Sequence, residues 1–375
     1  MIQKYNRWVF ALALGLSSTY AIAQTDTTEV EEDYSIYDNL DFVDEGAKRF
    51  APVKIKGVSP QKLITIGYDY QGGYNMDQQK LFKLNETNRS IYDESDSTAA
   101  VNSTQGIRLE ANIPVIAKNN LIVQVGARYW NINYAFEEKS NLKDPMMQTL
   151  AENGLTSIGL NTTVYKPLNE NSFLLFNADA DMSGDFNYTD FQPLKYNRYS
   201  VAALWGKRPS DNKQWAIGLS RTYRAGELNY IPVFLYNWTS INNTWGAEVL
   251  FPAKAHLRYT LNPRSMLFAG FELEGNSFRI GNQGFDKTTS GDPALQDLEL
   301  RRSELRFRLM YERQITGFIW LSAQAGYRYD YSYNVDQVND GEDFFRGFFG
   351  DQPFAAENSL TNPLYFNISI NLVSP

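Results

Sequence analysis

The sequence predicts an all-β fold, a transmembrane antiparallel up-and-down β-barrel of about 14 strands, with about 12 as the alternative count. One observation is a rhythm of roughly ten-residue segments between Gln61 and Val373, in which apolar and polar residues alternate as in membrane barrel strands. Another is that 14% of the residues are aromatic although the mean hydropathy is -0.42, which excludes a chain of continuous apolar helices. The third is that short and long connections alternate between the segments.

A targeting segment is predicted at the N-terminus. Lys4 and Arg7 precede a short apolar run, and Ala21 and Ala23 form a small-x-small site, so residues 1–23 are predicted to be a signal peptide cleaved after Ala23. The run is too short to span a membrane as a helix. The chain has no cysteine, which excludes disulfides, thiolate metal sites, a cysteine nucleophile and lipid attachment at an N-terminal cysteine. We therefore expect an exported protein located in the outer membrane.

Residues 24–60 are predicted to be an acidic, flexible periplasmic extension. Between Gln24 and Ala47 the sequence has nine acidic residues and no Lys or Arg, and such a run lacks the apolar surface that offsets the entropy cost of ordering. Several apolar residues between Tyr34 and Val43 support an alternative, in which the segment folds against the barrel mouth as a plug or binds a partner.

Residues 61–375 are assigned to the barrel. The predicted strands are 61–73, 104–116, 121–135, 154–166, 172–182, 195–207, 214–224, 228–239, 245–251, 254–261, 265–280, 298–312, 317–334 and 363–373. If the pair of strands around Pro252 is irregular, the count drops to twelve.

The connections predict the orientation of the barrel. Short ones contain Asn, Asp, Pro and Gly and are predicted to be periplasmic turns. The long polar connections are predicted to be outer loops: 75–102, 136–153, 183–193, 281–297 and 335–362. Aromatic residues near strand ends predict girdles at the lipid–water boundary, formed by Tyr68, Tyr70, Trp205, Trp215, Trp238, Trp245, Tyr327, Tyr329, Tyr331 and Tyr333.

The chain resembles Gram-negative outer-membrane β-barrel proteins that carry a domain of unknown function. The resemblance covers about residues 50–375 and rests on the strand-turn-strand rhythm and on the segments IPVFLYNW, WGAEVLFP and HLRY between Tyr230 and Tyr259. It implies a barrel in the outer membrane, with membrane lipid and the barrel-assembly machinery as partners, and no particular chemistry. The final strand agrees with it, although the chain ends on Val373, Ser374 and Pro375 rather than on an aromatic residue.

Strand alternation directs charged side chains of both signs into the lumen. The predicted ladder comprises Arg108, Glu110, Arg128, His256, Arg258, Glu272, Glu274, Glu304, Arg306, Arg308, Arg328 and Asp330. A turn at 262–264 is expected to place His256 opposite Glu272 and Arg258 opposite Gly270. The ladder has two interpretations: paired charges that fill a narrow lumen, or a mixed-charge constriction in a water-filled pore.

Catalysis is not expected, because His256 is the only histidine, it points inward, and no nucleophile–base pair can be named. No cofactor is expected apart from calcium. Oxygen ligands at the spacing of a calcium loop form a candidate site, of which the alternative is an ordinary polar turn: Asp179, Asp181, Ser183, Asp185 and Asp190.

The last predicted outer loop contains five phenylalanines that should not stand in water, and it is predicted to be a gating loop in the barrel mouth: Phe344, Phe345, Phe348, Phe349 and Phe354. Taken together, the sequence predicts a channel or small-solute transporter that works by passive diffusion. One alternative is the uptake of hydrophobic molecules, because this loop and a possible plug resemble features of outer-membrane fatty-acid transporters. Another is a structural or adhesive surface protein with a filled lumen. Nucleic-acid binding is not expected, because there is no basic patch.

Overall fold

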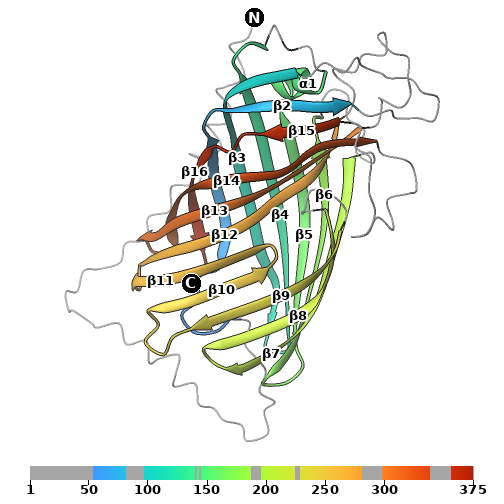
Figure 1. Cartoon of the computed structure of the whole chain (residues 1–375). Helices are drawn as coiled ribbons and strands as arrows, with labels where there is room; N and C mark the ends of the chain where they lie inside the picture. The colour runs from blue at the N-terminus through green and yellow to red at the C-terminus, as the bar shows by residue number, and fades with distance from the viewer. Residues whose placement is uncertain are drawn as a thin grey trace, which may run out of the picture. The chain divides into compact units, whose positions relative to one another are not determined.

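The computed structural model describes residues 54–81, 97–139, 142, 145–186, 196–223, 229–280, 298–337 and 356–374, all of which belong to one compact unit. The strands are β1 (Lys62–Gln71), β2 (Tyr74–Leu81), β3 (Ser97–Lys118), β4 (Leu121–Phe136), β5 (Leu155–Pro167), β6 (Ser172–Gly184), β7 (Asn197–Ser210), β8 (Lys213–Thr222), β9 (Asn229–Thr239), β10 (Trp245–Phe251), β11 (Lys254–Asn262), β12 (Ser265–Ile280), β13 (Leu298–Thr316), β14 (Ile319–Gln337), β15 (Ala356–Leu360) and β16 (Leu364–Val373). A helix, α1 (Pro145–Glu152), lies between β4 and β5 in the sequence (Figure 1).

The sheet closes on itself because β1 pairs with both β16 and β3. From β3 to β14 each strand pairs antiparallel with the next, and β14 pairs with β16. The strands β1, β3 to β14 and β16 therefore form a closed wall of fourteen, as predicted. Each of the fourteen predicted segments corresponds to one of these strands, including the pair around Pro252.

Two further strands correct the prediction that 75–102 and 335–362 are entirely loop. β2 pairs with β3 and β15, and β15 also pairs with β14, so the two strands continue the wall beyond β1 and β16. Strand alternation is interrupted in the sequence at Gly72 and Gly73, and again at Pro363. At these points the chain leaves one strand and enters the next, so β2 and β15 were missed. We call this end of the barrel, which carries the long connections, the loop end; the opposite end is the turn end.

The outer face of the wall is apolar. Along β16 the side chains alternate between exposed and buried at every position, with Phe366, Ile368 and Ile370 at least 50% exposed and Asn367 and Ser369 buried. A closed wall with apolar side chains outside and polar ones inside is the arrangement of a membrane-spanning β-barrel. In the described residues, the one helix is too short and too polar to cross a bilayer.

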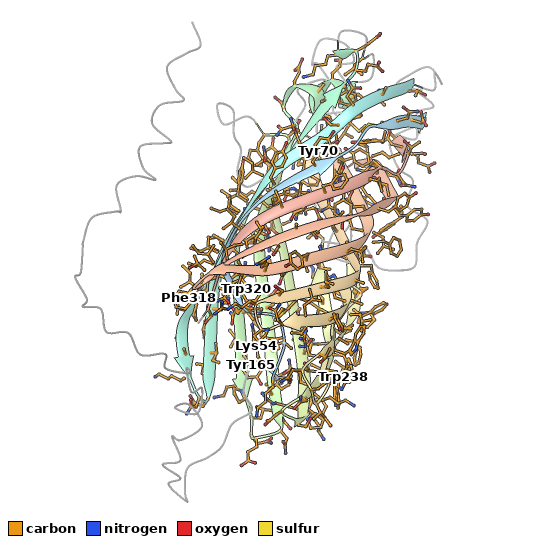
Figure 2. The ribbon with its side chains drawn as sticks, turned by 90° about the vertical axis from the view of Figure 1, so that its left-hand side faces the viewer. Lys54, Tyr70, Tyr165, Trp238, Phe318 and Trp320 are labelled. Atoms are coloured by element: carbon orange, nitrogen blue, oxygen red, sulfur yellow. The ribbon has the colours of Figure 1, made fainter. Side chains whose placement is uncertain are left out.

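Aromatic side chains occur on the outer face toward both ends, as Tyr70 and Trp238 show in Figure 2. Trp205 packs edge-to-face on Trp215, with ring centroids 5.7 Å apart. Tyr333 departs from the predicted girdle because it is buried inside the barrel. A bulge in β14 opposite Ser303 and Glu304 inserts one extra residue, which reverses the inward and outward positions beyond it.

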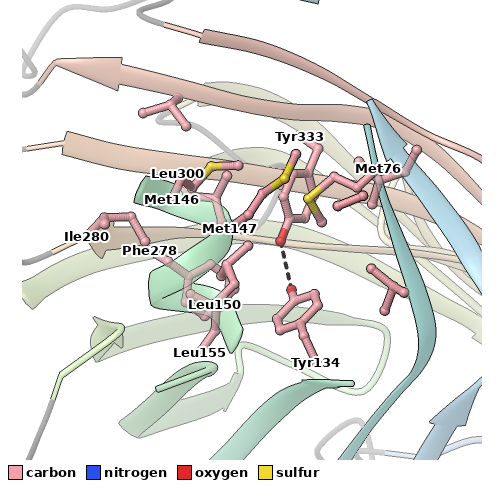
Figure 3. Packing of buried hydrophobic residues seen from close by; sticks show 14 of the residues in the cluster. Met76, Tyr134, Met146, Met147, Leu150, Leu155, Phe278, Ile280, Leu300 and Tyr333 are labelled. Atoms are coloured by element: carbon pink, nitrogen blue, oxygen red, sulfur yellow. Dashed lines mark hydrogen bonds between the residues drawn. The ribbon is translucent and has the colours of Figure 1, made fainter. Parts of the chain in front are cut away.

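An apolar core fills the loop end of the barrel (Figure 3). Helix α1, in the segment predicted to be an outer loop, begins at a proline, which suits the first helical position, and is followed by Gly154 with φ +64°. Its Met146, Met147 and Leu150 are at most 1% exposed and pack among side chains from the surrounding strands. Burial of three large apolar side chains holds the helix inside the wall.

The wall differs in height around the barrel. β10 and β11 have 7 and 9 residues, whereas β3 and β13 have 22 and 19. Beyond the short strands, β6 and β12 meet although five strands separate them in the wall: Arg279 pairs with Gly184, and the Asp185 N–H donates to the Arg279 carbonyl at 3.1 Å. This contact constricts the loop end.

Candidate functional site in the barrel lumen

One side of the lumen is occupied by a charge network on β1, β3, β12, β13 and β14. Glu304 is 0% exposed and accepts ion pairs from three arginines: Arg302 at 3.0 Å, Arg328 at 3.6 Å, and Arg306. Arg306 also reaches Glu274 at 2.8 Å. Arg108 of β3 joins the network by pairing with both Glu274 and Asp69. Most of these pairs lie within β13 or between neighbouring strands, whereas Arg108 of β3 and Glu274 of β12 belong to strands that are not neighbours, so their pair ties two separate parts of the wall together.

Smaller charge groups extend from this network. Arg308 pairs with Glu272 and donates from Nε to Nε2 of His256 at 3.1 Å. Arg258, which is 0% exposed, pairs with Glu248 at 3.0 Å. Every residue of the predicted ladder occupies an inward position. The backbone N–H of Asp330 donates to Oδ1 of Asn362 at 2.9 Å.

The expected register of β11 and β12 is wrong by two residues. Glu272 lies opposite Lys254 rather than His256, His256 lies opposite Gly270, and Arg258 lies opposite Phe268. The reason is the tight turn, in which Asn262 pairs with Ser265 next to a bulge. A shift of two residues keeps each side chain on the same face, so all three still point inward.

The candidate calcium ligands are divided by the structure. Asp179 and Asp181 both bind Arg128, with Asp179 Oδ1 at 2.9 Å from Nη1. Ser183 shares a hydrogen bond of 2.8 Å with Ser157. Asp190 lies outside the described residues, as do all five phenylalanines of the predicted gating loop. In the described part of the chain, no group of three or more metal-ligating side chains is assembled.

A cavity of about 520 Å³ occupies the other side of the lumen. Its wall on β3 to β6 is polar. Its wall on β6 to β10 is mostly apolar, with Leu175, Ala202, Leu204, Val233 and Leu250, and also carries the hydroxyl groups of Ser200, Ser220 and Thr222. A second cavity of about 360 Å³ lies beside the charge network, and the two share Glu110, Lys254 and Glu272. The lumen is therefore partly filled and partly hollow.

Two asparagines converge on the polar wall of the larger cavity. Asn112 and Asn161 lie opposite Gly126 on its two sides, and the Asn161 amide atoms are 2.6 Å from where a Cβ on Gly126 would be. The absence of a side chain at Gly126 gives both amides room to lean over the backbone. We call Asn112 and Asn161, with Thr163 and Asn177 beside them, the amide cradle. The sequence analysis did not identify this cradle. It could have been found from two inward asparagines on β3 and β5 that lie on either side of an inward glycine on β4.

The segment Lys54–Pro60, which we call the strap, binds the wall at the turn end. Ser59 donates to Glu248 of β10 from its N–H at 3.0 Å and from its hydroxyl at 2.7 Å. Arg208 of β7 donates to the Lys54 carbonyl at 2.7 Å, and the Lys56 N–H donates to the Asp211 carbonyl at 2.8 Å. Since β7 and β10 lie across the fourteen-strand wall from β1, the strap crosses the opening (Lys54 is labelled in Figure 2).

The strap belongs to the segment 24–60 that was predicted to be flexible. Its Ile55 is only 3% exposed, and Gly57 has φ +72° and lies against Thr239 at the end of β9 and Asn243 of the β9–β10 turn. This stretch consists mainly of lysines and small residues and has no apolar periodicity, so the sequence does not predict its contact with the barrel wall. The rest of the acidic extension lies outside the described residues.

Fold and lumen together define a membrane-spanning β-barrel of fourteen strands with a core at one end and a strap at the other. Residues 75–372 match the family described as a domain of unknown function, DUF6268, and the chain belongs to that family. No curated protein sequence gives a significant match.

Several solved structures match this chain over most of its length. A FadL homologue from Pseudomonas aeruginosa is 9% identical, with a TM-score of 0.36 over 87% of this chain and 100% of the other. The toluene transporter TodX from Pseudomonas putida is 10% identical, with a TM-score of 0.32 over 84% of this chain and 90% of the other. The outer membrane protease OmpT from Escherichia coli is 10% identical, with a TM-score of 0.29 over 84% and 98%. At such distances no property of these proteins is transferred to this chain.

Proposed function

We propose that the chain is an outer-membrane transport barrel that passes small molecules through a gated lumen. The observation that carries this proposal is the 520 Å³ cavity inside the wall, placed between the apolar core at the loop end and the strap at the turn end. Its volume is within the range of about 300–1,000 Å³ that small-molecule sites occupy. The turn end faces the periplasm in this proposal, because short turns lie on that side in bacterial barrels.

The charges favour a structural role for most of the predicted ladder. Arg108, Arg128, Arg306 and Arg308 each end on a carboxylate, and paired charges of this kind fill space and brace the wall. Glu110 and Lys254 face the larger cavity, and no ion pair is recorded for either within the described residues. These two side chains, rather than the network, would contact a passing molecule. No catalytic step is proposed.

Flux measurements test the proposal. The purified, refolded protein is placed in liposomes and in a planar bilayer, with folding verified by its heat-dependent shift in gel migration. We expect low conductance in the resting protein and protein-dependent flux of small solutes, which rises when the strap is released. If neither the native chain nor a strap-released variant carries any solute faster than empty liposomes, the proposal fails and a structural or adhesive surface role remains.

A further inference from the structure

The barrel wall has an opening on one side, which we call the window. Residues 229–233 of β9 pair only with β8, and residues 274–278 of β12 pair only with β13 in the described structure. The β10–β11 turn forms the lower edge of the window, and the contact between Gly184 and Arg279 forms its upper end. Three strand spacings separate β9 from β12, so the window is about 14 Å wide at its base.

The local sequence fits an unpaired edge at this place. Pro232 of β9 lies within the unpaired stretch, and proline has no N–H to donate to a neighbouring strand. β12 leaves its β11 partner after the Leu273 N–H donates to the Ala253 carbonyl at 2.7 Å. On both edges of the window, the hydrogen-bonded pairing with the neighbouring strand therefore stops at a defined residue.

The larger cavity reaches the window. In a closed wall, a lumenal cavity touches only side chains at inward positions, because successive residues of a strand point to opposite faces. This cavity is also lined by Phe251 and Leu273, which occupy outward positions beside the window, and Phe251 is 53% exposed. The cavity thus continues through the wall to the outer, lipid-facing surface.

The polarity of the lining changes along this path. The rim and the near wall are mostly apolar, with Ile231, Pro252 and Leu273 at the window and Leu204 and Val233 further in. The far wall is the amide cradle, whose side chains both donate and accept hydrogen bonds without carrying a charge. A molecule with an apolar chain and a neutral hydrogen-bonding head matches both walls at once.

We propose that the larger cavity is a binding site for an uncharged, single-chain amphiphile that enters from the membrane through the window. Its head group, a hydroxyl or an ester carbonyl, binds Asn112 and Asn161, and its chain lies along Leu204, Val233 and Leu250. A charged head is disfavoured because the lining charges offset one another: Arg128 is paired with Asp179, Glu272 is paired with Arg308, and Glu110 and Lys254 have opposite signs. This inference deepens the proposed transport function by naming the class of molecule and its route.

Photolabelling in lipid nanodiscs tests the binding site. The probe is 1-monolauroylglycerol with a diazirine in its chain, competed by unlabelled 1-monolauroylglycerol, and the modified peptides are located by mass spectrometry. We expect saturable labelling of peptides that contain Leu204 or Leu250. Asn161→Leu should weaken binding about fivefold through the loss of a hydrogen bond to the head. Thr65→Val, a change in the second cavity only, should leave binding unchanged.

The absence of cysteine from the chain allows the window to be closed chemically. Ile231→Cys and Leu273→Cys on its two edges are bridged with a bismaleimide, and we expect the saturable labelling to be lost. The control pair is Leu257→Cys with Ala269→Cys, which face each other on the intact wall. Bridging the control pair should not affect the labelling.

The outcomes separate the site from the transport function. The site is refuted if labelling of the native chain is not saturable, or if lauric acid and dodecylammonium compete as well as the neutral compound. The route is refuted if labelling survives the bridge across the window. Flux in liposomes without labelling would refute the binding site and leave the proposed transport function standing. Labelling without flux would refute the transport function and leave the binding site standing.

Discussion

Replacing Gly57 by valine should release the strap from the turn end of the barrel. Gly57 has φ +72°, and a Cβ placed on it would be 2.8 Å from Cγ2 of Thr239 and 3.0 Å from Oδ1 of Asn243. A side chain at positive φ costs about 1–2 kcal/mol, and forcing extra atoms into a packed contact costs about 1–3 kcal/mol. Gly57 lies outside every strand, so the barrel itself should fold unchanged.

The size of the effect follows from these costs. The strap is held by the burial of Ile55, worth about 1.5–3 kcal/mol, and by hydrogen bonds worth about 0.5–1.5 kcal/mol each. Losing at least about 2 kcal/mol of that attachment raises the population of released strap roughly 30-fold. The strap should therefore spend far more time away from the opening in Gly57→Val than in the native chain.

The assay uses the accessibility of the cavity beside the strap. Ser369, which lines that cavity together with Ser59 and Pro60, is replaced by cysteine in the otherwise cysteine-free chain. A membrane-impermeant maleimide added from the turn end should react about 30-fold faster in the presence of Gly57→Val.

Gly317→Val is the matched control for this assay. Gly317 also has positive φ, +44°, but nothing lies within 4 Å of its Cβ position, so the substitution adds strain without a clash. If Gly57→Val and Gly317→Val give the same reaction rate, the strap does not cover this opening and the reasoning is refuted.

Three further substitutions test the packing of the lumen. Glu304→Gln leaves three buried arginines without their shared carboxylate and should destabilise the barrel by about 3–5 kcal/mol in urea unfolding, while unchanged stability would show that the network does not brace the wall. Leu150→Ala removes a fully buried side chain of α1 and should cost about 2–5 kcal/mol in the same assay, against a negligible cost for the exposed Leu219→Ala. Gly126→Ala places a methyl group where Asn112 and Asn161 converge, so it should reduce probe labelling without lowering stability by more than about 3 kcal/mol; equal labelling would exclude the cradle from binding.

The wall could be predicted from the sequence because lipid and lumen impose opposite demands on alternate residues. An apolar residue such as Ile368 faces lipid and a polar one such as Asn367 faces the lumen. Alternation of this kind is sufficient to locate the strands and to count them. Pairing between strands depends on turn geometry, which alternation does not encode, and the expected contact of His256 with Glu272 was therefore displaced by the bulge beside Asn262.

The candidate site was harder to predict because its parts come from strands far apart in the sequence. Strand alternation predicts which single charged residues face the lumen. The convergence of Arg302, Arg306 and Arg328 on Glu304 depends in addition on the shape of the closed wall. Helix α1 and the strap were assigned to a loop and to a flexible extension because neither has a strand pattern. Their positions are determined by burial of Leu150 and Ile55 against the completed barrel.

The contact between β6 and β12 creates a second, smaller ring at the loop end. Going through β5, β4, β3, β2, β15, β14 and β13, this ring contains nine strands, and an odd ring of alternating strand directions must close on one parallel pair. The observed pair, Gly184 with Arg279, is parallel and is the only register position recorded between the two strands. The large ring is thus closed by continuous antiparallel ladders, whereas the small ring is closed by one residue pair. Opening that point would merge the two rings and widen the mouth without breaking any of the antiparallel ladders in the wall.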